Sequence, residues 1–231
     1  AQKHTVNYTM RFEAAYFERL YDQADLVLIP TFKKKKEKHL LYSYIDPILR
    51  QKPEDLASES VLMKKFHLKK KPFLVMLGGS DFGTKLAQNM NIIASSFPNE
   101  SFIIFGGDLS FSFAKNVRYV QYTPEFLQYL KVSKGVITLA GQKTLTEALV
   151  YHKPILCFPI LDHIEQTLNA YALEHVALVC RDSSLRGVGR AFTEFLKNLS
   201  SFQRKSKALN LGAQGSEQFV KLVVSTLEKR D

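Results

Sequence analysis

The sequence contains one segment that combines a glycine, hydroxyl side chains and a carboxylate at the spacing of a strand-to-helix turn. It is Thr138–Glu147, with the sequence Thr-Leu-Ala-Gly-Gln-Lys-Thr-Leu-Thr-Glu. Gly141 permits close approach of the backbone, and Thr144 adds a hydroxyl to the free amides of a helix start, where phosphate oxygens bind well. Glu147 lies one turn beyond Thr144 on the same helix face and suits the vicinal hydroxyls of a ribose. On its own, Glu147 is better explained as an acid that the helix dipole favours.

A second loop has paired glycines between an apolar run and a helical pattern. It reads Leu77-Gly-Gly-Ser-Asp-Phe-Gly83. Gly78 and Gly79 allow a sharp turn and close approach to a ligand, and Ser80 or Asp81 can cap the helix that follows. Free amides at that helix start would favour an anion. The spacing is not the full dinucleotide fingerprint, so nicotinamide binding gains little support. A tight turn without a ligand explains the loop equally well.

A third segment clusters polar side chains at the start of another helix. Asp162, Glu165, Gln166 and Asn169 follow the apolar run Pro154–Phe158. Glu165 and Asn169 share a helix face, so two acceptors and an amide could hold the hydroxyls of a sugar. Helix capping with an exposed polar face is an equal alternative.

Apolar runs alternate with helical patterns over most of the chain. Six runs are candidate strands: Phe73–Leu77, Ser101–Phe105, Val117–Val120, Gly135–Leu139, Pro154–Phe158 and Ala177–Cys180. Helical spacing occurs at 84–96, 125–131, 144–151 and 165–174, and in the tail at 184–199, 203–209 and 217–227. The alternation predicts an α/β fold, a doubly wound, Rossmann-like parallel sheet of about six strands with helices on both faces. Ligands bind such sheets outside the carboxyl ends of the strands, so we expect the three loops to meet there.

The first part of the chain fits a different unit. A helical pattern over 9–23 precedes the strand candidate at Asp25–Pro30, and another short strand is expected at Leu41–Ile45. A lone helix and strand cannot bury both of their faces. We therefore expect residues 1–46 to be the remnant of an N-terminal domain plus a linker. Residues 47–231, beginning with a helix over 54–66, should form the Rossmann-like domain.

Composition and charge limit the other classes of function. The chain has 231 residues and 45% hydrophobic residues, and its apolar runs are too short to span a bilayer. The polar opening has no signal-peptide pattern, and Cys157 and Cys180 fit buried free thiols, so we expect a cytoplasmic protein. No Cys/His spacing resembles a metal site, and no metal or other cofactor is expected.

The net charge of +10 is concentrated in clusters. One is Lys33–Lys38, and the other comprises Lys64, Lys65, Lys69, Lys70 and Lys71. Solvated loops and helix ends explain both clusters best. A non-catalytic basic module that binds an anionic membrane or nucleic acid is an alternative. Nucleic acid is not the expected partner, because neither interleaved aromatics nor a recognisable motif accompanies the lysines.

Taken together, the motifs resemble the C-terminal domain of GT-B-fold glycosyltransferases. The pattern Gly-x-x-Thr-x-x-Glu-Ala-Leu begins at Gly141, Lys-Pro-Ile-Leu at Lys153, and Pro-x-x-Asp-His-x-Glu-Gln-x-x-Asn-Ala at Pro159. The glycine loop Gly78–Ser80 and the interdomain-like segment Asp46–Arg50 extend the resemblance. It is closest to the lineage of the bacterial peptidoglycan N-acetylglucosaminyltransferase and archaeal predicted glycosyltransferases.

The resemblance implies that this domain binds a nucleotide-sugar donor, a UDP-sugar by family preference, without a metal. The turn from Arg118 to Tyr122 would face the base and Glu147 would hold the ribose. Ala140, Gly141, Gln142, Lys143 and Thr144 would surround the diphosphate, beside Gly78, Gly79 and Ser80. Asp162, Glu165, Gln166 and Asn169 would hold the sugar. The expected reaction is transfer of a hexose or N-acetylhexosamine to a lipid-linked or glycan acceptor, at the inner face of a membrane if Lys33–Lys38 binds anionic lipid.

The sequence departs from the family pattern in three respects. Ala140 and His175 stand where glycines are usual, and the N-terminal domain that binds the acceptor is represented only by its last helix and strand, about residues 8–30. No catalytic base can be assigned. We expect the chain to be inactive alone and to need the missing N-terminal domain or a separate acceptor-binding subunit. A nucleotide-sugar hydrolase or epimerase of the same fold is the other enzymatic alternative.

Overall fold

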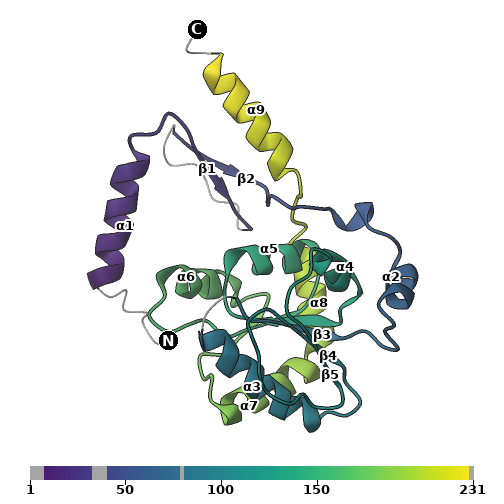
Figure 1. Ribbon diagram of the computed structural model, residues 1–231. Coiled ribbons are helices and arrows are strands. Elements are labelled where there is room, and N and C mark those ends of the chain that lie inside the picture. Colours follow the sequence, from purple (N-terminus) through teal and green to yellow (C-terminus); the bar gives the residue numbers. More distant parts are fainter. Residues whose placement is uncertain (1–7, 33–40, 79–80, 229–231) are drawn as a thin grey trace. The chain divides into compact units, whose positions relative to one another are not determined.

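The computed structural model describes residues 8–32, 41–78 and 81–228 (Figure 1). The chain divides into two compact units. Residues 50–211 form one unit, and residues 1–49 together with 212–231 form the other. Among the described residues, no helix is both long and apolar enough to cross a membrane.

The larger unit is a doubly wound α/β domain. Its six strands are parallel and lie in the order β5-β4-β3-β6-β7-β8. The strands are β3 (Phe73–Met76), β4 (Phe102–Phe105), β5 (Val117–Val120), β6 (Gly135–Thr138), β7 (Ile155–Cys157) and β8 (Leu178–Val179). The helices are η1 (Pro53–Asp55), α2 (Glu59–Lys65), α3 (Asp81–Ser95), α4 (Phe126–Val132), α5 (Gln142–Val150), α6 (Ile164–Leu173), α7 (Leu185–Lys197) and α8 (Leu199–Ala208). The predicted fold class and all six predicted strands are confirmed.

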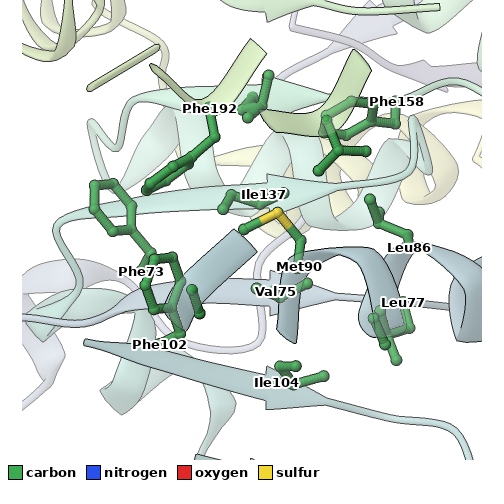
Figure 2. Packing of buried hydrophobic residues seen from close by; sticks show 14 of the residues in the cluster. Phe73, Val75, Leu77, Leu86, Met90, Phe102, Ile104, Ile137, Phe158 and Phe192 are labelled. Atoms are coloured by element: carbon green, nitrogen blue, oxygen red, sulfur yellow. The ribbon is translucent and has the colours of Figure 1, made fainter. Parts of the chain in front are cut away.

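The central strands are buried on both faces, which explains their continuous apolar sequences. On one face, α3 and α7 pack against β3, β4 and β6 (Figure 1). Figure 2 shows Phe73, Phe102 and Phe192 together in this layer, with ring centroids 5.2 Å apart for Phe73 and Phe192. On the other face, Phe105 meets Phe126 of α4 edge to face at 5.5 Å. Each large apolar side chain buried in this way stabilises the fold by roughly 1.5–3 kcal/mol.

A buried lysine lies where α5 leads into β7, at the amino edge of the sheet. Lys153 is 8% exposed, and its ammonium group donates to the carbonyl oxygens of Lys131, at 2.7 Å, and Ser133, at 3.1 Å. Burial lowers the pKa of Lys153 to about 8. The lysine therefore links the end of α4 to the start of β7 from inside the protein.

The smaller unit contains α1 (Tyr8–Tyr21), β1 (Val27–Pro30), β2 (Tyr42–Ile45) and α9 (Gly215–Leu227). β1 and β2 form a parallel pair. The start of α9 lies against the end of β2, where Gln218 Oε1 accepts a hydrogen bond of 2.7 Å from the Asp46 amide. A side chain on Gly215 would lie 2.2 Å from the Asp46 carbonyl oxygen, so this approach requires glycine.

Some boundaries differ from the sequence expectation. The tail was expected to belong with the sheet domain, but the contact of α9 with β2 groups residues 212–231 with the first segment. The helix expected over 54–66 is two helices, η1 and α2, because Leu56 is extended and Ser58 begins a new helix. The helix expected from Thr144 begins at Gln142, after the extended residue Gly141. Cys157 and Cys180 are free thiols as predicted.

Candidate functional site

The carboxyl ends of the six strands lie level with one another. The register aligns Val120 with Phe105, Phe105 with Met76, Met76 with Thr138, Thr138 with Cys157, and Cys157 with Val179. The chain runs from β3 outward through β4 and β5, then returns beside β3 with β6 and continues through β7 and β8 in the other direction. The switch point lies between β3 and β6, where an open α/β sheet has its ligand crevice. The loops that follow Met76 and Thr138 flank this point.

Glycines in left-handed conformations line the β3 and β4 side of the crevice. Gly78 has φ +65°, and Gly106 and Gly107 have φ +88° and +71°. A side chain on Gly106 would come 3.8 Å from the Gly78 carbonyl oxygen, so the two turns are neighbours. Gly79 and Ser80, predicted to contact the diphosphate, lie outside the described residues. Gly106 and Gly107 were not predicted, although a Gly-Gly pair directly after an apolar run is the same signal that identified Gly78.

Gly83 has a different role, which the sequence interpretation missed. It lies in the first turn of α3, and a Cβ atom there would be 2.3 Å from the Leu77 carbonyl oxygen and 2.9 Å from the Leu77 Cβ. The glycine therefore lets α3 start directly against the end of β3. This brings the amino end of α3 to the switch point.

The turn from β6 into α5 exposes a glycine that the fold itself does not require. Gly141 is the N-cap of α5, with φ −69°, which any residue can adopt. A Cβ atom on Gly141 would meet no atom of the described residues within 4 Å. Lys143 is exposed and Thr144 is half-buried in the first turn of α5, whereas Ala140 is fully buried. The open space therefore adjoins the helix start, where free amides favour anions.

Glu147 is a buried carboxylate one turn into α5. It is 3% exposed, and Nη2 of Arg50 lies 3.5 Å from its Oε1. Burial raises the pKa of the Glu147 carboxyl, and the positive charges of Arg50 and Lys143 lower it in part. A carboxylate this deeply buried needs a partner to remain ionised, and Arg50 supplies one.

The polar groups of α6 bind main-chain atoms of the neighbouring turn. Gln166 Oε1 accepts hydrogen bonds from the amides of Ala140, at 3.2 Å, and Ile160, at 3.0 Å. Asn169 donates to the Ala140 carbonyl oxygen at 3.0 Å. Glu165 Oε1 accepts from the Gln142 amide at 3.4 Å. The structure thus brings three of the predicted sugar-binding residues together around the β6–α5 turn, and all three bond to its main chain.

Asp162 lies in the loop between β7 and α6. It is exposed and has a left-handed backbone with φ +62°. Asp tolerates this conformation better than most residues. Its side chain is therefore accessible beside the Glu165 end of α6.

The two residues predicted to face the base, Arg118 and Tyr122, have different surroundings. Tyr122 follows the carboxyl end of β5 and is 82% exposed, so it lies at the correct edge of the sheet. Arg118 lies two residues before that end, and its guanidinium donates to the Phe66 carbonyl oxygen at 3.1 Å, at the end of α2. The Arg118 side chain therefore links β5 to α2, and the contact of the turn from Arg118 to Tyr122 with a base stays a prediction.

Among residues 8–32, 41–78 and 81–228, no three His, Cys, Asp or Glu side chains are grouped so that they could hold a metal ion. The charged groups of the crevice are instead Glu147 with Arg50, Lys143, Asp162 and Glu165. The arrangement joins an anion-favouring helix start to a buried carboxylate on one side and to exposed acceptors on the other.

Comparison with known families and proteins gives a consistent result. The model of glycosyl transferase family 1 matches residues 20–200. An uncharacterized glycosyltransferase of Methanopyrus kandleri is 24% identical over 224 residues, covering 91% of this chain and 63% of the relative. Another, of Methanosarcina acetivorans, is 28% identical over 177 residues, covering 69% of this chain and 44% of the relative. The chain therefore spans between about two fifths and two thirds of these relatives.

Solved structures share the fold at low sequence identity. The calicheamicin glycosyltransferase CalG4 has a TM-score of 0.63 at 16% identity, covering 99% of this chain and 63% of that one. The UDP-GlcNAc 2-epimerase of Neisseria meningitidis, solved with UDP-GlcNAc bound, has a TM-score of 0.52 at 17% identity, covering 74% of this chain and 48% of that one.

Proposed function

Because the chain belongs to glycosyl transferase family 1 and has the α/β architecture of GT-B enzymes, we propose that residues 50–211 bind the nucleotide-sugar donor of a sugar-transfer reaction. The donor is a UDP-sugar carrying a hexose or N-acetylhexosamine. It lies across the switch point between β3 and β6, with its diphosphate at the start of α5. No metal or other cofactor takes part.

The observation that carries this proposal is the combination of Glu147 with Gly141 on one helix. Neither the backbone angle nor a protein neighbour of Gly141 requires glycine, so the missing side chain leaves room for an incoming group. Diphosphate oxygens in that space would meet the amides of Lys143 and Thr144, beside Gln142, whose own amide donates to Glu165. Glu147, one turn further, would accept hydrogen bonds from the vicinal hydroxyls of the ribose. The spacing fits a nucleoside diphosphate better than a single anion.

The rest of the donor occupies the two ends of the crevice. Tyr122 would contact the base from the loop after β5. The turn at Gly78 would admit the phosphates, and Gly79 and Ser80, which lie outside the described residues, are proposed to contact them. Asp162 and Glu165, with the amide nitrogen of Gln166, would hold the sugar hydroxyls. Asn169 would act indirectly, through the Ala140 carbonyl oxygen that it already binds.

The acceptor side requires more protein than the described residues supply. β1 and β2 form an isolated parallel pair, and two strands alone are only marginally stable. A groove of about 470 Å³ in the same unit is lined by apolar residues of β1 and α9, among them Leu28, Phe219 and Val223. These features support further strands and helices, from an N-terminal domain or a separate acceptor-binding subunit, that bind a lipid-linked or glycan acceptor and contribute the catalytic base. This chain by itself would not transfer sugar.

Membrane attachment through Lys33–Lys38 remains part of the proposal, and these lysines lie outside the described residues. They would bring a cytoplasmic enzyme to an anionic inner membrane surface, where a lipid-linked acceptor is found. Nucleic acid is not a proposed partner.

The proposal is tested by titrating the chain with UDP in a calorimeter. We expect binding by the wild type and a loss of roughly tenfold to hundredfold in affinity for Glu147→Gln, because the amide removes one charge-assisted acceptor. Glu194→Gln is the matched control, since Glu194 is an exposed acid on α7. Absence of heat with any nucleoside diphosphate would refute donor binding.

The second candidate function is supported by the fold shared with the Neisseria meningitidis 2-epimerase. A hydrolase or epimerase would convert the donor without an acceptor. Incubation of the chain with UDP-sugars, followed by chromatography, distinguishes the two: release of free sugar or appearance of an epimer favours the second function.

A further inference from the structure

The charge of Glu147 depends on a residue from outside the three site loops. Glu147 is 3% exposed, and Arg50 is the one cation among the described residues that contacts its carboxylate. The contact joins Arg50 Nη2 to Glu147 Oε1 at 3.5 Å, and the Arg50 side chain is 45% exposed. One carboxylate oxygen is thus held by the guanidinium. A vicinal diol needs such an acceptor.

We propose that Arg50 is a positioning residue, which orients the Glu147 carboxylate and keeps it ionised so that it can accept both hydroxyls of the donor ribose. This role rests on the proposed function. The proposal assigns a function in the donor site to the last residue of the segment Asp46–Arg50, which precedes the strands of the sheet domain in the sequence.

The position of Arg50 relative to α5 is fixed by a hydrogen bond to the next residue in the chain, Gln51. The Tyr151 hydroxyl donates to the Gln51 carbonyl oxygen at 3.0 Å. Tyr151 lies one turn beyond Glu147 at the end of the same helix, so the backbone next to Arg50 is attached to the element that carries the carboxylate. The guanidinium therefore approaches Glu147 from a fixed point, while its outer part stays in solvent.

The charge of Arg50 affects the protonation of Glu147 and therefore its ability to accept hydrogen bonds. Burial favours the neutral form of Glu147 and raises its pKa, and Arg50 opposes this effect more strongly than Lys143, which contributes charge without contact. The pKa of Tyr151, at the end of the same helix, is raised by burial and by the negative charge of Glu147, so Tyr151 stays neutral. Loss of Arg50 would shift Glu147 toward the protonated acid, which has one acceptor fewer for the ribose.

The test compares Arg50→Met and Arg50→Lys with the wild type in titrations with UDP between pH 5.5 and 8. A second titration uses 2′,3′-dideoxyuridine diphosphate, which keeps the base and the diphosphate but lacks both ribose hydroxyls. Arg204→Met is the matched control, because Arg204 is an exposed arginine on α8. Circular dichroism establishes that each variant is folded.

We expect Arg50→Met to weaken UDP binding, increasingly so at low pH, with a loss that approaches tenfold per pH unit below the pKa of Glu147. In the wild type this decline should begin at lower pH. Arg50→Lys should restore part of the affinity and shift the decline back toward the wild-type pH. Affinity for the dideoxy nucleotide should not depend on residue 50.

Three results would overturn the role of Arg50. Equal losses for both nucleotides without a change in pH dependence would mean that the guanidinium acts on the diphosphate. Unchanged UDP binding in both variants would mean that Glu147 does not need its partner. If Arg50→Met does not fold, Arg50→Gln replaces it, and UDP affinity and pH dependence in Arg50→Gln equal to those of the wild type have the same meaning. Absence of UDP binding by the wild type would instead refute the proposed donor site itself, and the role of Arg50 with it.

Discussion

Gly83 and Gly141 lie on two helices that begin at the same edge of the sheet, and replacing each with alanine should have opposite consequences. At Gly83 the new methyl group would be 2.3 Å from the Leu77 carbonyl oxygen and 3.0 Å from the Leu77 carbonyl carbon. Both are backbone atoms of the segment that leaves β3, so a side-chain rotation cannot relieve the contact. At Gly141 the methyl group would meet nothing within 4 Å in the part of the chain that the structure describes.

The size of the effect follows from these distances. The Gly83→Ala methyl group lies about 1 Å inside an ordinary carbon–oxygen contact of about 3.3 Å, so α3 must move away from β3. That movement loosens the contacts of buried residues such as Leu86 and Met90, and overpacking of this kind costs about 1–3 kcal/mol. The upper value applies because the clash is with backbone, and alanine's better helix propensity offsets at most about 1 kcal/mol. A net loss of about 2 kcal/mol remains, or roughly 4–8 °C in melting temperature.

Thermal unfolding followed by circular dichroism measures this difference. Gly141→Ala should melt within about 2 °C of the wild type, because a weaker N-cap is offset by the lower entropy of the unfolded chain. It should nevertheless weaken UDP binding, whereas Gly83→Ala should lose stability first. A Gly83→Ala variant as stable as the wild type, or a Gly141→Ala variant that is the less stable of the two, would refute the account of both glycines.

Two further changes test other parts of the structure. Arg118→Ala should cost about 1 kcal/mol, by removing the hydrogen bond to Phe66 from a partly exposed side chain, and leave the affinity for UDP within about twofold; a tenfold loss in a titration would return Arg118 to the donor site. Lys153→Met should remove a pH dependence: the pKa of Lys153 is lowered to about 8 in the folded chain, below its value of about 10.4 when unfolded, so the unfolded state binds more protons between these values. The wild type should therefore gain stability relative to the variant, by up to about 3 kcal/mol, as the pH rises from 8 toward 10.4 in urea unfolding experiments. A stability difference that is constant or shrinks over this range would contradict the lowered pKa.

The strands were predictable because burial on both faces leaves a direct trace in the sequence. Phe73–Met76 and Phe102–Phe105 are continuous apolar runs, and neither face of these strands meets solvent. Helix boundaries were less predictable. The start of α5 at Gln142 depends on the extended backbone of Gly141, and a glycine in sequence does not reveal which conformation it adopts.

The direction of a side chain was the hardest property to predict. Arg118 lies four residues before Tyr122, and the sequence interpretation assigned both to one turn. The predicted strand Val117–Val120 already contained Arg118, and the structure adds that its guanidinium donates to the Phe66 carbonyl oxygen at the end of α2. The sequence could not establish this contact, because Phe66 lies 52 residues away in the chain and comes close to β5 only in the folded protein.

The polar cluster on α6 shows that predicting the position of a residue correctly does not establish its function. Gln166 and Asn169 lie where a sugar-binding cluster was predicted, yet they bond to the backbone of Ala140 and Ile160. Asn169 also donates to the Glu165 side chain. Ala140 and Ile160 lie in the loops after β6 and β7. Only the folded structure shows that their backbone groups need a side-chain partner, because this depends on how the strands are aligned. The same residue types therefore satisfy both explanations that the sequence left open. They hold the β6–α5 turn in place, and a turn held in this way keeps the amides of α5 directed at the crevice where the diphosphate is proposed to bind. Gln166→Leu would therefore be expected to impair the diphosphate end of the site even if no atom of Gln166 touched the ligand.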